Sequence, residues 1–509
     1  MSAPDLSERV ADALTVDDEA FERRAAEEAE TLKSEVEAGT FDNAQAIVGL
    51  ELELYAVDDR TDALTRVPRH LLELIGFEKE LGLHNAEMQT SPQPLNRYGL
   101  EAQQRELQAN LAPALDRLHA EDLRLVADGM WTVPPRGETA TDYLCDSVDH
   151  DGVTLATNMS ESVRYHAMAN SEYRPGMRLD APHVALQADT VMPESLITSI
   201  QPHYQVPHAP DLPEYFRYAL RIAGPLLAIG VNSPFFPPDL YDDAPDEEIV
   251  TDAHMEHRVG VFETVLNSRE RTPKVTFPPD FASVDAAIEA ILDDETIVPM
   301  TVETTGRFDD EFAHVRHKHG SYWRWIRPVF DGATRSAANA RIEFRPLPAQ
   351  PTLLDAVAFQ AVFGGLLRSL TSREHPVRNM DHDAAEANFY AATRDGLQAD
   401  LTWITADGEQ TDNLDRLYSE LFEYARDGLE LYGLSTDQAR RYIRPLRERV
   451  DRRVTPARWK HDVVREAIER NTPLTEAIWG MQSRYLREQE PTLLEGSFVD
   501  WLDDPATGP

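Results

Sequence analysis

Gly49-Leu50-Glu51-Leu52-Glu53-Leu54 and Arg341-Ile342-Glu343-Phe344-Arg345-Pro346 are the two stretches that decide the fold. In both, charged residues alternate with apolar residues. This pattern is typical of β-strands, because successive side chains of a strand point to opposite faces. Glu51 therefore shares a face with Glu53, and Glu343 shares one with Arg345. Three carboxylates and a guanidinium brought together are the chemistry that holds Mg²⁺ and a polyphosphate. An ATP-dependent enzyme is the first hypothesis.

The composition limits the class of protein. The chain has 509 residues, of which 42% are apolar, so it can bury a large core and form about two domains. A net charge of −41 excludes a general nucleic-acid binder, which needs a basic surface. Only five of the 49 basic residues are lysine. An acidic, lysine-poor surface suits multimolar salt, where a Debye length of about 3 Å screens the self-repulsion. We therefore predict an extreme halophile.

The expected location is the cytoplasm. The single cysteine, Cys145, excludes an intramolecular disulfide framework. Residues 1–40 are acidic and lack an apolar signal core, and the chain has no run of 18 apolar residues. We expect a protein that binds small molecules and neither nucleic acid nor a membrane. Its oligomeric state is left open.

Residue periodicity predicts an α+β chain in three parts. These are an acidic helical segment (1–43), a mixed core (44–370) and a helical C-terminal part packed on the core (371–509). Residues 134–184, rich in turn-forming residues, are expected to be long loops. The expected strands are 47–57, 199–206, 298–304, 322–327 and 340–345, and the expected helices are 5–38 (one or two), 100–118, 212–231, 356–370 and those of 373–502.

Other polar positions fit the same site. Glu87 could bring another oxygen ligand, although it could equally be a surface carboxylate. Gln201, His203 and Gln205 alternate with apolar residues, so they form either a satisfied polar strand face or a set near a metal or phosphate. Pro202 lies within that segment, and because proline lacks an N–H it predicts an edge strand or a bulge.

An aromatic and arginine-rich segment follows later in the chain. Trp323, Trp325 and Arg327 would share a strand face, either as ordinary packing or as an adenine or amino-acid platform beside a phosphate-binding guanidinium. Arg258, expected on a helix, is either a surface ion-pair partner or a substrate clamp. Neither G-x-x-x-x-G-K-[ST] nor G-x-G-x-x-G occurs. Carboxylates, metal ions and arginines would therefore have to hold ATP.

The order of these segments resembles glutamate–cysteine ligase family 2, a carboxylate–amine ligase family of the glutamine-synthetase-like superfamily, in a haloarchaeal-type member. The resemblance covers roughly residues 44–490. The matching segments are Gly49–Glu53 (family pattern G-x-E-x-E), Glu87 with Thr90-Ser91-Pro92 (E before T-P-P), His203–Val206 (H-V-H-V), Ala228–Phe235 (L-x-A-N-S-P-F), His257-Arg258 (S-R), Trp325–Pro328 (W-D-x-R-P), Arg341–Arg345 (T-x-E-V-R) and Glu386–Leu397 (E-N-R-x-x-A-x-x-G-L).

The resemblance implies a curved, mainly antiparallel sheet that forms a funnel for ATP and Mg²⁺ or Mn²⁺, flanked by helices. It also implies a role for each matching residue. Those roles are metal ligation by Glu51, Glu53, Glu87 and Glu343, stabilisation of the transferring phosphoryl group by Arg327 and Arg345, contact with a metal or phosphate by His203 or Gln205, and binding of substrate or ATP by Arg258 and Trp325.

The implied reaction joins the γ-carboxylate of glutamate to an amine through a γ-glutamyl phosphate. Cysteine is the first choice of amine, which would place the enzyme in γ-glutamylcysteine and glutathione biosynthesis. Gln205 replaces the second histidine of the family pattern and Ile326 replaces its aspartate, so the amine stays open. The alternatives are a ligase for another amine or acid, and a non-catalytic paralogue that binds a nucleotide or an amino acid.

Overall fold

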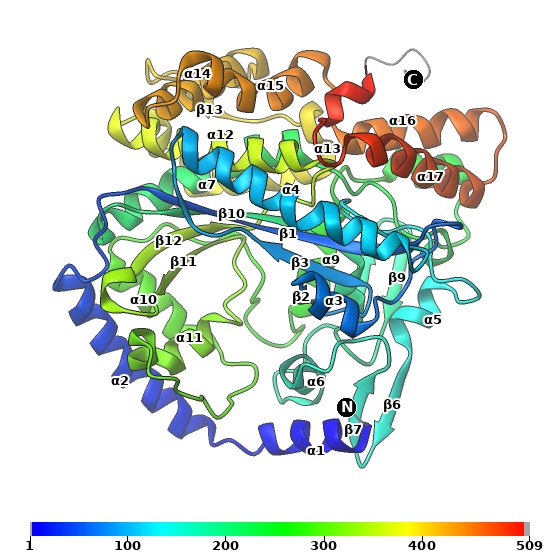
Figure 1. Cartoon of the computed structure of the whole chain (residues 1–509), viewed down its shortest axis with the longest axis horizontal. Helices are drawn as coiled ribbons and strands as arrows, with labels where there is room; N and C mark the ends of the chain where they lie inside the picture. The colour runs from blue at the N-terminus through cyan, green and yellow to red at the C-terminus, as the bar shows by residue number, and fades with distance from the viewer. Residues whose placement is uncertain (1–2, 503–509) are drawn as a thin grey trace.

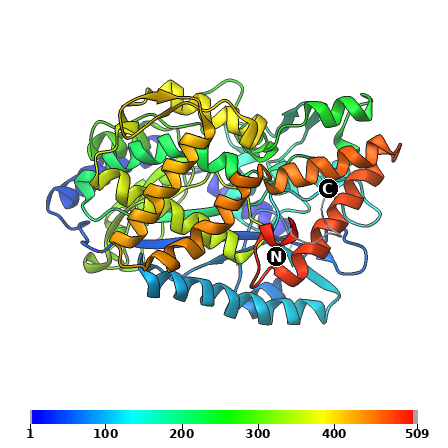
Figure 2. The ribbon, with the colours of Figure 1, turned by 90° about the horizontal axis from the view of Figure 1, so that it is seen from above.

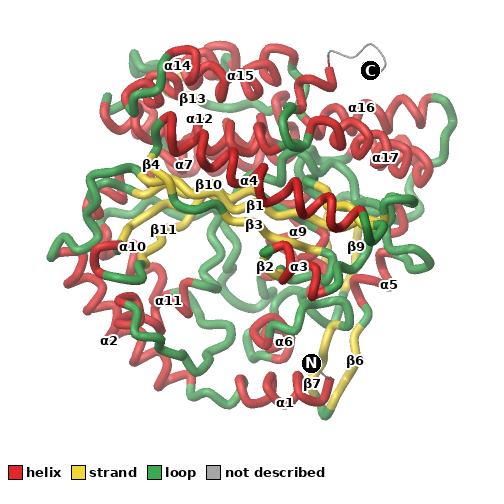
Figure 3. The backbone as a smooth tube through the Cα atoms, viewed as in Figure 1, coloured by secondary structure: helices red, strands yellow, loops and turns green. Residues whose placement is uncertain are grey.

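An antiparallel sheet of eight strands forms the centre of the computed structural model, which describes residues 3–502 (Figure 1). The strand order is β11-β12-β10-β1-β3-β2, and β4 and β5 also pair with β1. Every pair is antiparallel and the sheet is curled, which confirms the predicted fold class (Figure 3). The strands are β1 (Ile47–Asp58), β2 (Glu78–Lys79), β3 (Asn85–Gln89), β4 (Gln93–Pro94), β5 (Leu123–Val126), β10 (Ile200–Gln205), β11 (Ile326–Asp331) and β12 (Asn339–Phe344).

The alternation in β1 gives the sheet one apolar and one polar face. Leu50, Leu52 and Leu54 are at most 2% exposed, whereas Glu51 and Glu53 are partly exposed. The apolar face packs against a layer of helices that includes α4 (Arg97–His119), α7 (Leu212–Gly230) and α12 (Leu353–Ser372) (Figure 1). Because that layer covers one side only, the polar residues of β1 face the opposite half of the molecule.

Pro202 lies in an internal strand, so the edge-strand alternative is wrong and the bulge alternative is confirmed. His203 pairs with Glu343, whereas Ser199 pairs with Pro348. Between these two pairs, β10 has three residues, whereas the segment from Glu343 to Pro348 has four. The extra residue in that segment makes a one-residue bulge. The missing N–H of Pro202 falls opposite this bulge, where the ladder is already interrupted.

The helix α12 is a core element. It is the one helix among the described residues whose length and composition would suit a membrane span, but 89% of its most apolar window is buried inside the protein. Its N-terminus is capped by Thr352, which accepts from the Asp355 N–H. Its burial on all sides explains why it is apolar all round.

The C-terminal helices α14 (Leu414–Leu431), α15 (Thr436–Arg452), α16 (Pro456–Glu469) and α17 (Leu474–Thr492) pack on the core, as predicted (Figure 2). A Cβ on Gly428 of α14 would lie 1.8 Å from the Gly365 carbonyl oxygen of α12, so only glycine allows this helix crossing. Lys460 of α16 is buried and donates to Asp128 and to the Asn232 carbonyl. These contacts anchor the C-terminal part at two places.

Three predicted segments are wrong in detail. Residues 298–304 form no strand, because Pro299 lacks a donor and the Val298 carbonyl accepts from His317 of a helix. Of 322–327, only the last two residues enter β11, since the Trp325 N–H bonds Thr276 outside the sheet. The expected loops at 134–184 contain α5 (Ala140–Cys145), α6 (Val163–Asn170) and the strands β6 (Ser147–His150), β7 (Val153–Ala156) and β8 (Arg178–Ala181), and β9 (Val184–Gln187) follows.

The helices α1 and α2 follow the outer side of the polar half of the molecule (Figure 1). The division of the chain near residues 43 and 370 stays a prediction, and residues 1–2 and 503–509 of its outer parts lie outside the described residues. The remaining elements are α1 (Ala3–Ala13), α2 (Asp18–Glu37), α3 (Arg69–Ile75), α8 (Asp246–Asp252), α9 (His257–Leu266), α10 (Val284–Asp293), α11 (Ala313–His319), α13 (His382–Asp395), β13 (Trp403–Ile404) and β14 (Gln410–Thr411).

The glycine contact between α12 and α14 yields a stability test. Gly428→Ala should destabilise the protein by about 1–3 kcal/mol, because the new methyl group overlaps the Gly365 carbonyl and forces the helices apart. The matched control is Gly480→Ala in α17, where a Cβ meets nothing within 4 Å. There the better helix propensity of alanine should stabilise by up to about 1 kcal/mol. Urea unfolding monitored by circular dichroism measures both, and equal effects would contradict the packing argument.

Candidate active site

Cross-strand register places the polar side chains of the sheet in rows on one face. Arg327 pairs with Glu343, Glu343 with His203, and His203 with Gly49. Two residues further along β1, Glu51 lies between Gln201 and Gln89, and the next row pairs Glu53 with Glu87. Side chains two residues apart on a strand share a face. The sheet therefore brings together these sequence-predicted positions: Glu51, Glu53, Glu87, His203, Gln205, Arg327 and Glu343.

Glu343 lies between two guanidinium groups at one end of these rows. Its Oε1 is 2.9 Å from Nε of Arg327 and 2.6 Å from Nη1 of Arg345. Burial opposes ionisation of Glu343, but the two arginines hold its pKa well below the usual range. Arg327 also donates to the His319 carbonyl, at 3.1 Å. Both guanidinium groups are therefore fixed beside an ionised carboxylate.

The middle of the face is a chain of polar contacts from Glu51 to Asp331. Nε2 of His203 lies 3.2 Å from Oε1 of Glu51, although the angle is not that of a hydrogen bond. Nδ1 of His203 accepts from Nε of Arg341 at 3.2 Å, and Arg341 also pairs with Asp331 at 2.7 Å. Because Nδ1 accepts, the proton of the neutral imidazole belongs on Nε2, facing Glu51.

Carboxyl groups crowd the other end of the face. Glu53 is held by the N–H and hydroxyl of Ser199, at 2.6 and 2.8 Å, and by Gln201. Burial, followed by the charge of Glu53, raises the pKa of Glu194 to about 7. Burial also raises the pKa of Glu80 to about 7, although its hydrogen bond with Glu87 opposes this shift. Burial and a hydrogen bond with Glu80 raise the pKa of Glu87 to about 11. These carboxyl groups ionise together only when a cation compensates their repulsion.

This donor set fits divalent cations and a polyphosphate. Mg²⁺ and Mn²⁺ prefer carboxylate oxygens, and the crowded glutamates offer several from separate strands. Guanidinium groups bind phosphate oxygens through paired N–H donors. The residues that could hold a cation are Glu51, Glu53, Glu80, Glu87, Glu194 and Glu343.

A cavity of about 440 Å³ opens on the arginine end of this face. Its polar lining includes Glu51, Arg327, Arg341 and Glu343. A second cavity, of about 260 Å³, lies over Gly49, His203 and Gln205 and shares Glu51, Asp331 and Arg341 with the first. The shared residues make the two cavities adjoining parts of one site.

Two predicted binding residues lie beside the site in different ways. Arg258 of α9 is 3% exposed, donates to the Pro346 carbonyl at 3.3 Å and lies 5.4 Å over the ring of Trp325. The ring of Trp325 itself is fully buried against Phe262, and its Nε1 donates to Glu263 at 2.9 Å. Trp325 therefore offers no exposed ring face in this structure, which favours ordinary packing for this residue, and its role in binding stays a prediction.

Sequence reasoning missed several residues of the site. Glu80 lies in the short connection between β2 and β3, and Glu194 lies in the 3₁₀ helix η1 (Met192–Leu196), so neither belongs to an alternating pattern. Arg164 of α6 donates to the His317 carbonyl at 3.2 Å and thereby joins two walls of the cavity region. Only Arg341 carried a sequence signal, because it shares the strand face of Glu343.

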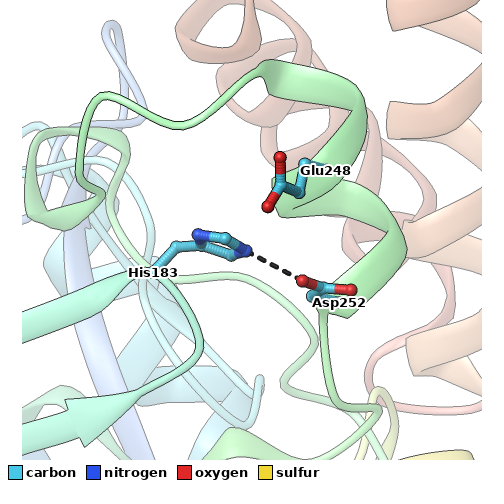
Figure 4. Close-up of side chains that lie close together, drawn as sticks. All are labelled: His183, Glu248 and Asp252. Carbon is cyan, nitrogen blue, oxygen red and sulfur yellow. Dashed lines mark hydrogen bonds and ion pairs between the residues drawn. The ribbon is translucent and has the colours of Figure 1, made fainter.

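A separate cluster of possible cation ligands lies on the surface. His183, Glu248 and Asp252 approach one another where the β8–β9 connection meets α8 (Figure 4). Nε2 of His183 is 3.0 Å from Oδ2 of Asp252, and this hydrogen bond raises the pKa of His183 above its usual value. The cluster is satisfied as an exposed ion pair and adds nothing to the candidate active site.

Solved structures with a similar fold include a glutamate–cysteine ligase from Francisella tularensis in complex with AMP. It has 14% sequence identity and a TM-score of 0.52, over 89% of this chain and 91% of that one. A bifunctional glutathione synthetase from Pasteurella multocida also has 14% identity, with a TM-score of 0.49, over 91% of this chain and 55% of that one. Among curated proteins, no sequence matches this chain.

A sequence profile of glutamate–cysteine ligase family 2 matches residues 47–478. The match spans every strand of the central sheet and most of the C-terminal helices. It confirms the family indicated by the order of the sequence motifs. The chain therefore belongs to glutamate–cysteine ligase family 2 and is an ATP-dependent carboxylate–amine ligase.

Proposed function

We propose that this protein joins the γ-carboxylate of glutamate to the amino group of cysteine, with cleavage of ATP to ADP and phosphate. The observation that carries the proposal is the gradation along one sheet face, from guanidinium groups around Glu343 to mutually repelling carboxyl groups around Glu87. Phosphoryl transfer requires both the guanidinium end and the carboxyl end of this face, because arginines and carboxylate-bound cations must neutralise the charge of the same phosphate groups.

The carboxyl groups of Glu51, Glu53, Glu80, Glu87 and Glu343 would hold Mg²⁺ or Mn²⁺. A bound divalent cation would neutralise phosphate oxygens and act as a Lewis acid. Arg327 and Arg345 would stabilise the charge that develops on the transferring phosphoryl group. Arg258, which is buried beside Glu53 and Glu194, would bind a substrate carboxylate.

The reaction would proceed in two displacements. A γ-carboxylate oxygen of glutamate attacks the γ-phosphorus of ATP, and the bond to the bridging oxygen breaks, so that ADP leaves. The amine nitrogen then attacks the acyl carbon of γ-glutamyl phosphate, and phosphate leaves with the electron pair of the carbon–oxygen bond. The amine loses its proton to solvent, and no protein nucleophile takes part.

Product analysis tests the function directly. In multimolar KCl, which screens the charge of −41, the protein with Mg²⁺, ATP, glutamate and cysteine should release ADP and form γ-glutamylcysteine, identified by mass. Glu53→Gln should lower turnover by about 100-fold or more, because it removes a cation ligand. The exposed Glu121→Gln should change turnover less than about twofold. If ADP is released only with another amine, that amine and not cysteine is the substrate. ATP binding without any turnover would indicate a non-catalytic paralogue.

Replacement of Arg345 by lysine separates charge from geometry. Arg345 contacts Glu343 and Gln201 through one nitrogen, at 2.6 and 2.7 Å, which directs the rest of the guanidinium group along the face. Lysine keeps the charge but loses the planar set of donors. We expect kcat to fall by about 100-fold with a smaller change in KM for glutamate. A change confined to KM would show that Arg345 binds substrate and does not stabilise the transition state.

Cation binding should appear without turnover. Mn²⁺ added to wild-type protein should raise the melting temperature, because it relieves repulsion among the glutamates; saturation at 100 times Kd corresponds to about 2.7 kcal/mol. Glu87→Gln replaces a carboxyl group of raised pKa by a neutral group of the same shape. It should leave metal-free stability nearly unchanged and reduce the Mn²⁺-dependent rise. An undiminished rise would remove Glu87 from the cation site.

A further inference from the structure

The N-terminal helix α2 forms part of the wall of the 440 Å³ cavity, although it lies outside the residues matched by the family profile. The match begins at residue 47, whereas α2 spans Asp18–Glu37 and contributes Leu32 to the lining. Leu32 is 1% exposed to solvent, so it is a buried apolar side chain at the edge of a charged cavity.

The cavity is lined by both apolar and charged side chains. Leu32 and other apolar side chains come from α2, α10, α11, β11 and the 3₁₀ helix η4 (Phe308–Phe312); the charged ones include Arg327, Arg341 and Glu343 of the sheet, Arg316 of α11 and Asp310 of η4. A nucleotide combines a flat, largely apolar base with an anionic tail and would use both kinds of side chain. The volume also lies within the range of about 300–1,000 Å³ for small-molecule sites. The apolar members are Leu32, Ile291, Val302, Phe312, Ala313, Val315, Val329 and Phe330.

Ion pairs hold α2 against α11, the helix that supplies the largest share of this lining. Glu22 of α2 accepts from the buried Lys318 at 3.0 and 2.9 Å. Glu28 accepts from the backbone N–H of His314 at 2.6 Å and pairs with its Nδ1 at 2.7 Å. Both glutamates precede Leu32 on the same helix, so α2 is held against α11 at two points.

The helix that precedes α2 in the chain contacts a different part of the molecule. The helix α1 packs against α6 and β7, and Ser7 shares a hydrogen bond of 3.0 Å with His150. Figure 1 shows α1 and α2 in succession around the side of the molecule opposite the C-terminal helices. Residues 3–37 therefore span from α6 to α11, outside the sheet.

We propose that α2 is a component of the nucleotide site, in which Leu32 forms the apolar floor beneath the base while the arginines hold the phosphates. This inference rests on the proposed function, since it requires ATP to occupy the cavity. It makes Leu32 a specificity-determining residue for the base end of the nucleotide, contributed by a segment outside the residues that the family profile matches.

Two tryptophan substitutions on the same helix test the assignment. Leu32→Trp enlarges an apolar side chain that lines this cavity, whereas Val36→Trp, one turn later, enlarges a side chain that borders a different cavity of about 690 Å³. Calorimetric titration with Mg²⁺ present should use ATP and, as a probe without a base, inorganic tripolyphosphate. Leu32→Trp should weaken ATP binding by about tenfold or more and change tripolyphosphate binding less than about twofold. Val36→Trp should leave both affinities unchanged.

Each other outcome overturns the inference in a distinguishable way. Unchanged ATP affinity in Leu32→Trp, with wild-type protein that binds ATP, removes Leu32 from the base site and leaves the proposed function intact. Equal losses in both variants assign the effect to helix displacement. Absence of ATP binding by wild-type protein overturns the proposed function itself. If Leu32→Trp does not fold, Leu32→Ala replaces it, with an expected loss of about threefold for ATP alone.

Discussion

Compensation of buried negative charge is the constraint on which the rest of this structure depends. Glu51 and Glu53 of β1, Glu87 of β3 and Glu343 of β12 project from one face, and β10 separates β12 from β1. An ionised carboxylate removed from water costs several kcal/mol unless it is paired. Glu343 meets this requirement within the protein through two guanidinium groups, and Glu53 through hydrogen bonds from Ser199 and Gln201. Glu87 accepts one hydrogen bond, from Gln89, but it shares its buried position with Glu80, so it carries a proton or requires a cation. That difference divides the face into a phosphate end and a cation end.

The opposite face of the sheet supports this arrangement. Because the polar side chains use one face, the strands can be held only by packing on the other, where α12 is buried along its whole length. The bulge opposite Pro202 has a related effect. It shifts the register after Glu343, and the shifted segment contains Arg345, whose guanidinium reaches back to Glu343 and Gln201. Pro202 of β10 and the extra residue in the opposite segment therefore both contribute to the position of Arg345.

The sequence allowed the strands β1, β10 and β12 and part of the site to be predicted, because alternation at period two is a local signal. The shorter strands β2, β3, β4 and β5 are not among the expected strands. Glu51, Glu53 and Glu343 were identifiable since each lies in a strand whose apolar partners are adjacent in the chain. Glu80 and Glu194 were not, because they lie in a connection and a 3₁₀ helix, where no periodicity distinguishes a site carboxylate from a surface one. The hairpin turn at Asp151-Gly152 does carry a signal, because an Asp-Gly pair favours a two-residue hairpin turn, and both residues have positive φ in the structure.

Trp325 illustrates a limit of reasoning from periodicity alone. It precedes Arg327 by two residues, so a strand through both would have placed its ring on the charged face. The Trp325 N–H instead bonds Thr276 outside the sheet, although its carbonyl still accepts from the Arg345 N–H, and its ring is buried against Phe262. The start of a strand thus decides whether an aromatic residue faces a ligand or the core, and strand starts depend on distant partners. Within the sheet, neighbouring strands lie about 4.8 Å apart, and alternate residues lie about 6.6 Å apart. That fixed lattice allows separate carboxylates and guanidinium groups to act on a single polyphosphate, which flexible loops would not position as closely.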